Sequence, residues 1–261
     1  MEGVNRLTIF VGILAVMIVW EIVMPRRQLL HSRWQRWSAN FALSLLSTVI
    51  MRFSIASAAV YFSTLVADHN WGVLNLVDLP NWLSILLSLV LLDLAIYGQH
   101  RVSHQWKWLW RFHKVHHTDL DFDVTTAIRF HPIEIILSMC YKVICILIIG
   151  ASTDAVLAFE IILSSCALFN HSNIKLPIVV DKIIRLFIVT PDMHRVHHSV
   201  IQRETDSNYG FSISIWDRLF KTYTAQPESG HEKMTIGLNQ YQHVPEVSLP
   251  RLLLMPFARA V

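Results

Sequence analysis

The chain has 261 residues, of which 53% are hydrophobic and only 16% are charged, and its formal net charge is +3. Soluble domains carry about a quarter charged residues, so this composition indicates a membrane protein. The mild net charge and its patterning by loop argue against nucleic-acid binding. The three cysteines lie in apolar runs without a C-x-x-C spacing, which excludes iron–sulfur, thioredoxin-like and zinc-ribbon sites.

Five apolar runs are candidates for membrane-embedded helices, because a bilayer core about 30 Å thick requires about 20 apolar residues. They are residues 7–24, 41–67 (interrupted by Arg52), 82–97, 133–150 and 155–169. A basic cluster, rather than a cleavage site, follows the first run, which we therefore interpret as a retained anchor. The last two runs either cross fully or form a re-entrant hairpin. The sequence predicts an all-α integral membrane protein with four to five embedded helices.

The charges of the first two loops predict the orientation. Residues 25–38 hold Arg26, Arg27, Arg33 and Arg36 and no acid, whereas residues 68–81 hold Asp68 and Asp78 and no lysine or arginine. The positive-inside rule then makes the first loop cytoplasmic and the second external. Threading the remaining runs places residues 98–132 and everything after Asn170 inside. The amino terminus is expected outside.

Histidine is over-represented, with 14 copies in the chain. Ten of them fall on the predicted cytoplasmic side or at its boundary: His100, His104, His113, His116, His117, His131, His171, His194, His197 and His198. The sequence H-x-x-H-H occurs twice among these, at residues 113–117 and 194–198, and H-x-x-x-H occurs at residues 100–104. A scattered set of core histidines has no reason to share one side of a membrane.

The spacing within these three blocks predicts metal binding. Residues three and four apart share a helix face, so each block is expected to direct its imidazoles toward one point. Neutral imidazole binds iron, zinc, copper and nickel. Eight histidines in three blocks exceed the four ligands of a tetrahedral zinc site, so we predict two metal ions, held by a helical cap at the cytoplasmic face.

These motifs resemble the fatty acid hydroxylase/sterol desaturase superfamily. The resemblance rests on "HRVSHQWKWLWRFHKVHH" at 100–117, "RFHP" at 129–132, "NHSN" at 170–173, "TPDMHRVHHS" at 190–199 and "NYGFSISIWDRLFKTY" at 208–223. It implies a non-heme di-iron oxygenase of the membrane that takes O₂ as co-substrate, and the basic first loop fits bacterial members, in the inner membrane. By position, the eight block histidines and His171 correspond to iron ligands, and His131 matches a further family histidine. Ala167 stands where some members carry another histidine, so the site has nine ligands, recruits His131, or leaves a position for water.

Acidic residues are candidates to orient the ligand histidines, because such histidines usually donate their second ring nitrogen to a carboxylate or carbonyl. We expect this role for Asp192, and for Asp93 either this role or an ion pair with Arg52. Glu134 is expected to cap a helix or to pair with Arg129. The alternating acids Asp119, Asp121 and Asp123 are expected in a solvated loop. Three tryptophans, Trp106, Trp108 and Trp110, are expected at the membrane interface, and Asn208, Tyr209 and Gly210 in a supporting turn.

The leading hypothesis is an oxidoreductase that hydroxylates or desaturates a membrane lipid with O₂ and electrons from a separate donor, of ferredoxin or cytochrome type with its reductase. The alternatives are a membrane zinc hydrolase, although no H-E-x-x-H motif is present, and a metal transporter, whose ligands would line a path through the spans. We expect membrane anchor helices and the basic loop in residues 1–81, the catalytic domain in residues 82–224 and a peripheral tail in residues 225–261. His243 lies in that tail, outside every histidine block.

Overall fold

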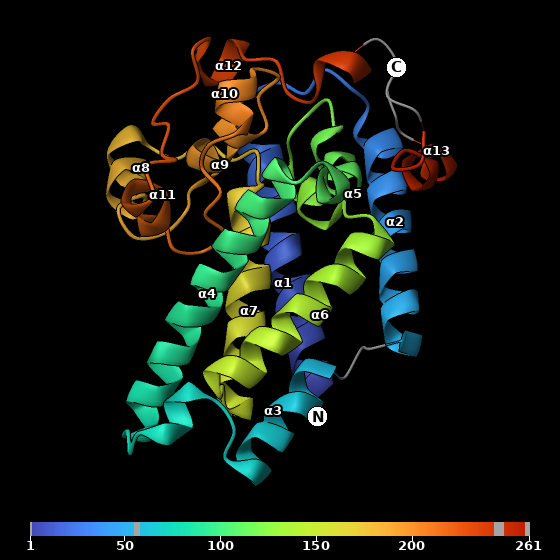
Figure 1. Cartoon of the computed structure of the whole chain (residues 1–261). Coiled ribbons are helices and arrows are strands. Elements are labelled where there is room, and N and C mark those ends of the chain that lie inside the picture. The colour runs from blue at the N-terminus through green and yellow to red at the C-terminus, as the bar shows by residue number, and fades with distance from the viewer. Residues whose placement is uncertain (1, 55–57, 243–247, 259–261) are drawn as a thin grey trace.

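The computed structural model describes residues 2–54, 58–242 and 248–258, which contain helices and no strand (Figure 1). The elements are α1 (Glu2–Val23), α2 (Arg33–Ser54), α3 (Ala58–His69), η1 (Val73–Leu76), α4 (Asn81–Gln105), α5 (Lys107–His117), η2 (Val124–Ile128), α6 (Pro132–Ile149), α7 (Thr153–Asn170), α8 (Ile178–Ile184), α9 (Pro191–His197), α10 (Gln202–Thr205), α11 (Ile215–Leu219), α12 (Gly230–Lys233), η3 (Asn239–Tyr241) and α13 (Leu249–Leu254).

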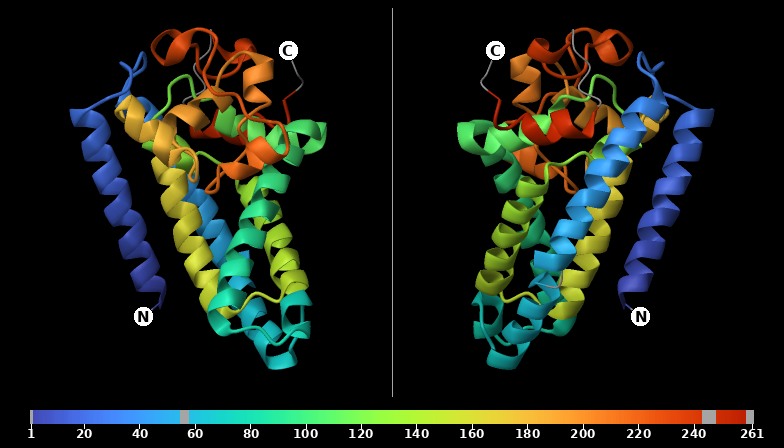
Figure 2. Two further views of the ribbon diagram at one scale, coloured as in Figure 1. Left: turned by 90° about the vertical axis from the view of Figure 1, so that its left-hand side faces the viewer. Right: turned by 90° about the vertical axis from the view of Figure 1, so that its right-hand side faces the viewer.

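The long helices run side by side, and most of the short ones gather at one end, whereas α3 lies at the other (Figure 2). Among the described residues, four helices are long and apolar enough to cross a bilayer: α1, α4, α6 and α7. The short helices α5 and α8–α13, with η2, form a cap, and α1 begins at the opposite end of the molecule. The predicted all-α membrane fold with a helical cap is therefore confirmed.

The second apolar run differs from its prediction as a single long segment. It is divided between α2, which begins already at Arg33, and α3; residues 55–57 between them lie outside the described residues. Helix α2 extends beyond the apolar run because its first turns carry Arg33 and Arg36 into the cap. Within the next two turns, Ala39 and Leu43 pack against Leu252 and Met255 of the C-terminal segment.

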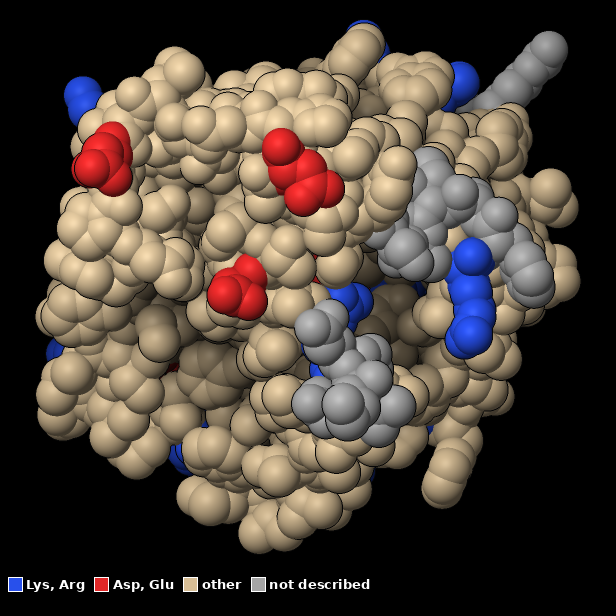
Figure 3. All heavy atoms as spheres, turned by 90° about the horizontal axis from the view of Figure 1, so that it is seen from below, with Lys and Arg blue, Asp and Glu red and all other residues tan. Residues whose placement is uncertain are grey.

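Helices α6 and α7 run in opposite directions and are connected at Gly150, and each packs against α3 and α4. Each has 18 residues, which at about 1.5 Å per residue gives a length of about 27 Å, close to the bilayer core. Gly150 has φ +82°, and a Cβ there would lie 2.7 Å from the carbonyl oxygen of Trp71. Glycine is required because both the positive φ and the close approach exclude a side chain. This turn lies at the end of the molecule opposite the cap. The surface of that end is largely uncharged (Figure 3).

The C-terminal segment is packed onto the cap. Met234 and Ile236 cluster with Phe122 of the loop after α5. Leu252 and Met255, at α13, contact Leu43 of α2 and Val115 of α5. The tail thus contacts α5, which carries the first H-x-x-H-H motif, and the loop that follows it.

Candidate metal centre

Nine histidines meet where the spanning helices enter the cap. Five form the first group, namely His100, His104, His113, His117 and His197, and four form the second, namely His116, His171, His194 and His198. Within each group, the nitrogen atoms that could bind a metal all lie within 4.8 Å of one another. The two groups adjoin, since the rings of His117 and His198 stack with centroids 4.5 Å apart.

Each H-x-x-H-H motif is divided between the two groups, which corrects the expectation that a block converges on one point. His113 and His117 face the first group and His116 faces the second. In the other motif, His197 faces the first group, while His194 and His198 face the second. The reason is helical geometry: residues four apart share a face, whereas adjacent residues point in directions about 100° apart.

The nitrogen spacings fit metal coordination. His171 Nε2 lies 3.1 Å from His116 Nε2 and 3.1 Å from His194 Nε2, and His113 Nε2 lies 3.3 Å from His117 Nε2. Two nitrogens bound at about 2.1 Å to one ion are about 3.0 Å apart at right angles and about 3.4 Å apart in a tetrahedron. The donor set therefore fits one metal ion in each group.

Four of the histidines have one ring nitrogen held by an acceptor. The Nδ1 atoms of His100, His171 and His197 contact the carbonyl oxygens of Tyr209, Ala167 and Ser207 at 2.7–2.8 Å. His113 Nδ1 is 2.6 Å from the Glu134 carboxylate. Such bonds fix the tautomer and aim Nε2 at the metal. The buried Nε2 atoms of His100 and His197 have no hydrogen-bond partner among the described residues, as a ligand position requires.

Burial keeps the imidazoles in the form that binds metals. Burial and then repulsion by neighbouring histidines hold the pKa values of His116, His117, His194 and His198 well below the ordinary value. The pKa values of His171 and His197 fall to about 3, again chiefly through burial. A neutral imidazole keeps a free lone pair on one nitrogen, so the group is ready to coordinate at physiological pH.

His131 does not join either histidine group. It caps the amino-terminal end of α6, where its Nδ1 accepts a hydrogen bond from the backbone nitrogen of Ile133. Its Nε2 lies 3.3 Å from the carbonyl oxygen of Leu253 in the C-terminal helix. Of the ten predicted ligands, the structure brings nine together; His243 lies outside the described residues.

The acids take roles that differ from those expected. Asp192 pairs with Arg26 and Arg195 and lies 3.6 Å from His231, not beside a histidine of either group. Asp93 accepts hydrogen bonds from the Ile213 backbone and the Trp216 indole, so it holds the segment that follows Tyr209, instead of pairing with Arg52. Glu134, expected at a cap or beside Arg129, is the carboxylate that contacts His113.

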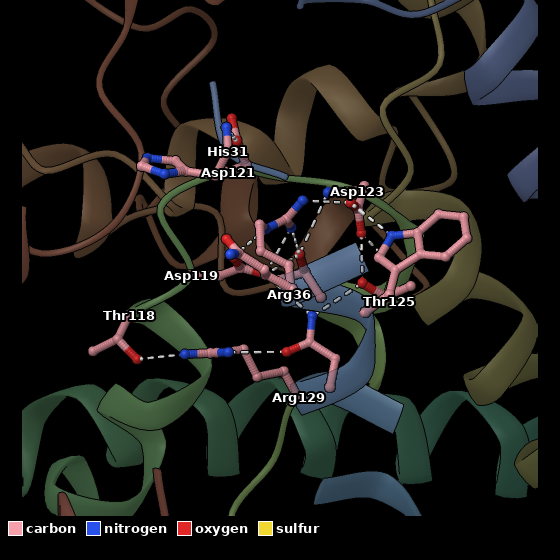
Figure 4. Close-up of polar contacts among 12 residues, drawn as sticks. His31, Arg36, Thr118, Asp119, Asp121, Asp123, Thr125 and Arg129 are labelled. Carbon is pink, nitrogen blue, oxygen red and sulfur yellow. Dashed lines mark hydrogen bonds and ion pairs between the residues drawn. The ribbon is translucent and has the colours of Figure 1, made fainter. Parts of the chain in front are cut away.

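The loop after α5 is buried, contrary to its prediction as a solvated loop (Figure 4). Arg36 of α2 contacts Asp119 and Asp123 at 2.5–2.8 Å. Asp121 accepts hydrogen bonds from the backbone nitrogens of Leu30 and His31. Burial raises the pKa of Asp119, but the adjacent Arg36 outweighs it and holds that pKa well below the usual range. The acids thus join the basic first loop and α2 to the segment that directly follows His117.

Aromatic rings enclose the histidines. Phe130 stacks on His116 with centroids 4.4 Å apart, and Trp110 lies 4.9 Å from His104. Tyr209, expected in a supporting turn, contacts the rings of His100, His104 and His197. The turn is confirmed: Asn208 has φ +51° and its amide bridges the carbonyl oxygens of Met193 and Thr224. Trp106 and Trp108 are exposed.

The sequence profile of the fatty acid hydroxylase family matches residues 85–222, which include all nine grouped histidines. The chain therefore belongs to the fatty acid hydroxylase family, and its apolar helices make it an integral membrane protein. No solved structure matches it.

Three relatives illustrate the range of the family. An ornithine lipid hydroxylase of Rhizobium tropici, OlsE, is 25% identical over 232 residues, which are 84% of this chain and 67% of the relative. Alkylglycerol monooxygenase of Homo sapiens is 28% identical over 182 residues, which are 67% of this chain but only 38% of the relative. Cholesterol 25-hydroxylase of Rattus norvegicus is 23% identical over 171 residues, covering 60% of this chain and 56% of the relative.

Proposed function

We propose that this protein is a non-heme di-iron oxidoreductase of the membrane that inserts oxygen from O₂ into a lipid. The observation that carries the proposal is the pair of adjoining groups of buried histidines at the end of the spanning helices. Nine imidazoles without a carboxylate ligand fit two ions of a metal that imidazole suits, and the family indicates iron. Hydroxylation is favoured over desaturation because the compared relatives are named as hydroxylases and monooxygenases.

The residues of each group would hold one iron, and a reduced iron pair supplies the activation of O₂ that breaking an unactivated C–H bond requires. The protein contributes position and exclusion of water. Tyr209 and Ser207 carbonyl oxygens and the Glu134 carboxylate orient three imidazoles of the first group. Phe130 and Tyr209 shield the histidines from solvent, which protects a reactive centre from side reactions.

The substrate class is a membrane lipid, and the centre lies where such a lipid can reach it. His100 and His104 stand in the last turns of the spanning helix α4, so the metal groups lie near the level of lipid headgroups. The relatives' names mention an ornithine lipid, an alkylglycerol and cholesterol, which share a long apolar part and a polar end. The four arginines of residues 25–38 support a cytoplasmic location of the cap, where a ferredoxin- or cytochrome-type donor would deliver electrons.

The proposal is tested by metal analysis of protein purified without oxygen, followed by lipid analysis. We expect two irons per chain and a coupled pair in the Mössbauer spectrum. In a deletion strain complemented with the gene, ¹⁸O₂ should label one lipid that the deletion strain lacks. An active protein that retains a single zinc per chain, and a product without ¹⁸O from O₂, would instead establish the membrane zinc hydrolase.

A further inference from the structure

One side of the cap exposes apolar side chains beside the spanning helix α4. It consists of α8 with the residues after it, 178–188, and of α11 with its flanking residues, 211–220; we call this pair of segments the apolar wedge. Phe187 is 69% exposed, Ile183 57% and Leu219 63%. Exposed apolar surface of this extent marks contact with a partner or with a membrane.

The two segments of the apolar wedge form one body. The backbone nitrogen of Val189 donates to the carbonyl oxygen of Ser212, and that of Ser214 donates to the carbonyl oxygen of Phe187. The Arg218 guanidinium donates to the carbonyl oxygen of Arg185. The guanidinium of Arg185 itself forms an ion pair with Asp181. The polar groups of the wedge therefore bond inward to each other, and its apolar side chains are left on the outside.

Hydrogen bonds to α4 set the depth of the apolar wedge. Asp93 accepts from the Ile213 backbone and the Trp216 indole. Asp93 precedes His100 by seven residues in the same helix, so it lies about 10 Å below the metal centre along a spanning helix. Ile215 lies between the two residues that donate to Asp93, and the carbonyl oxygen of Phe187 accepts from Ser214. Both side chains, which are 52% and 69% exposed, therefore lie near the level of Asp93 on the spanning helix.

We propose that the apolar wedge is embedded in the leaflet of the bilayer on the cap side. Its exposed surface continues the apolar surface of the spanning helix α4, to which it is hydrogen-bonded, so acyl chains are its occupant. Lys175 and Lys221, which flank the two segments, and Lys182 within α8 are exposed, and their long side chains can reach anionic headgroups. Figure 1 shows α8 and α11 on the same side of the cap, lower in the view than α10 and α12, and α11 is joined to α4 by the hydrogen bond from Trp216 to Asp93.

Embedding would bring acyl chains next to the metal centre. Phe211 begins the second segment of the apolar wedge, and its ring lies 5.6 Å from the ring of His100 and 6.2 Å from that of His194. On its other side, Phe211 packs against the apolar cluster between α3, α4, α6 and α7. Phe211 thus contacts a histidine of each group and the apolar interior of the bundle.

The test measures the surroundings of a spin label at single positions. The full-length protein, with Cys140, Cys145 and Cys166 replaced by alanine, is labelled at Phe187→Cys or Ile215→Cys and reconstituted in phosphatidylcholine–phosphatidylglycerol vesicles. Collision with O₂, which concentrates in acyl chains, is compared with collision with water-soluble chromium oxalate. Leu91→Cys, on the exposed side of α4, is the lipid control, and Lys233→Cys, in α12, is the water control.

We expect both wedge labels to match Leu91→Cys, with a ratio of O₂ to chromium accessibility several-fold above that of Lys233→Cys. A ratio equal to that of Lys233→Cys at either wedge position would overturn the proposal, because the wedge would then face water. Low accessibility to both reagents would also overturn it, since protein would then cover the surface. The measurement requires neither iron nor turnover, so its outcome is independent of the proposed oxidation.

Discussion

At the scale of single residues, histidines that are adjacent in sequence belong to different metal-binding groups. His197 and His198 are neighbours in sequence, but their nitrogens belong to the first and the second group. We expect His197→Ala and His198→Ala each to lower the iron content from about two to about one per chain and to abolish product, because each removes a ligand from one ion. Iron counting on purified protein checks this. His69→Ala, in α3 at the opposite end, is the control and should retain both irons.

The contact between Glu134 and His113 leads to a second prediction at this scale. The 2.6 Å contact orients an imidazole of the first group, and loss of such a partner typically lowers metal affinity about 10–100-fold. Glu134→Ala should therefore lose iron to a chelator at lower chelator concentrations than wild type. Glu228→Ala is the matched control, because Glu228 is exposed and pairs only at the surface with Arg203. Equal iron retention in both variants would show that His113 is held by other contacts.

Helix α2 is joined to the cap by ionic contacts that can be tested at the scale of elements. Arg36 is 1% exposed and pairs with Asp119 and Asp123, and removal of one partner from a buried ion pair costs about 3–5 kcal/mol. Arg36→Ala should therefore lower the thermal unfolding midpoint in detergent substantially. Arg203→Ala breaks a pair that is 70% and 59% exposed, which contributes about 0–1 kcal/mol, and should leave the midpoint almost unchanged.

The turn between α6 and α7 depends on glycine. Gly150 has φ +82° and no room for a Cβ, whereas nothing lies within 4 Å of a Cβ at Gly12 of α1. We expect Gly150→Ala to destabilise the protein by about 1–2 kcal/mol or more, through the left-handed backbone and the clash. Gly12→Ala should be neutral or stabilising, since alanine favours helices by about 1 kcal/mol over glycine. Thermal midpoints of the two variants in the same detergent provide the comparison.

The ends of the molecule carry opposite loop charges, which makes a prediction at the scale of the whole molecule. The arginines of residues 25–38 lie at the cap, and Asp68 and Asp78 lie at the other end. The positive-inside rule predicts from these charges that the cap faces the cytoplasm. A phosphatase reporter fused after Asn75 should be active outside, and a reporter fused at the carboxyl terminus should be active only in the cytoplasm. A carboxyl-terminal fusion active outside would reverse the location of the metal centre.

The sequence by itself determined the membrane class, the helical fold and the nine histidines that meet. It could do so because apolar run length and imidazole spacing act locally along the chain. It misplaced the acids, since the partner of a carboxylate depends on which distant segment packs beside it. Asp119 faces Arg36 across 83 residues, and Glu134 faces His113 across 21.

Only the tertiary structure decided how the histidines divide and which of the ten is left out. Each H-x-x-H-H motif has the same spacing whether it serves one point or two, and α4, α5, α7 and α9 assign the faces only when they are packed together. His131 shares the family pattern with the others, but it stands at the start of α6. There its Nδ1 accepts a hydrogen bond from the backbone nitrogen of Ile133 and caps the helix. The spacing along one helix determines the direction in which its imidazoles point. Whether imidazoles of several helices meet at one metal depends on how those helices are packed together.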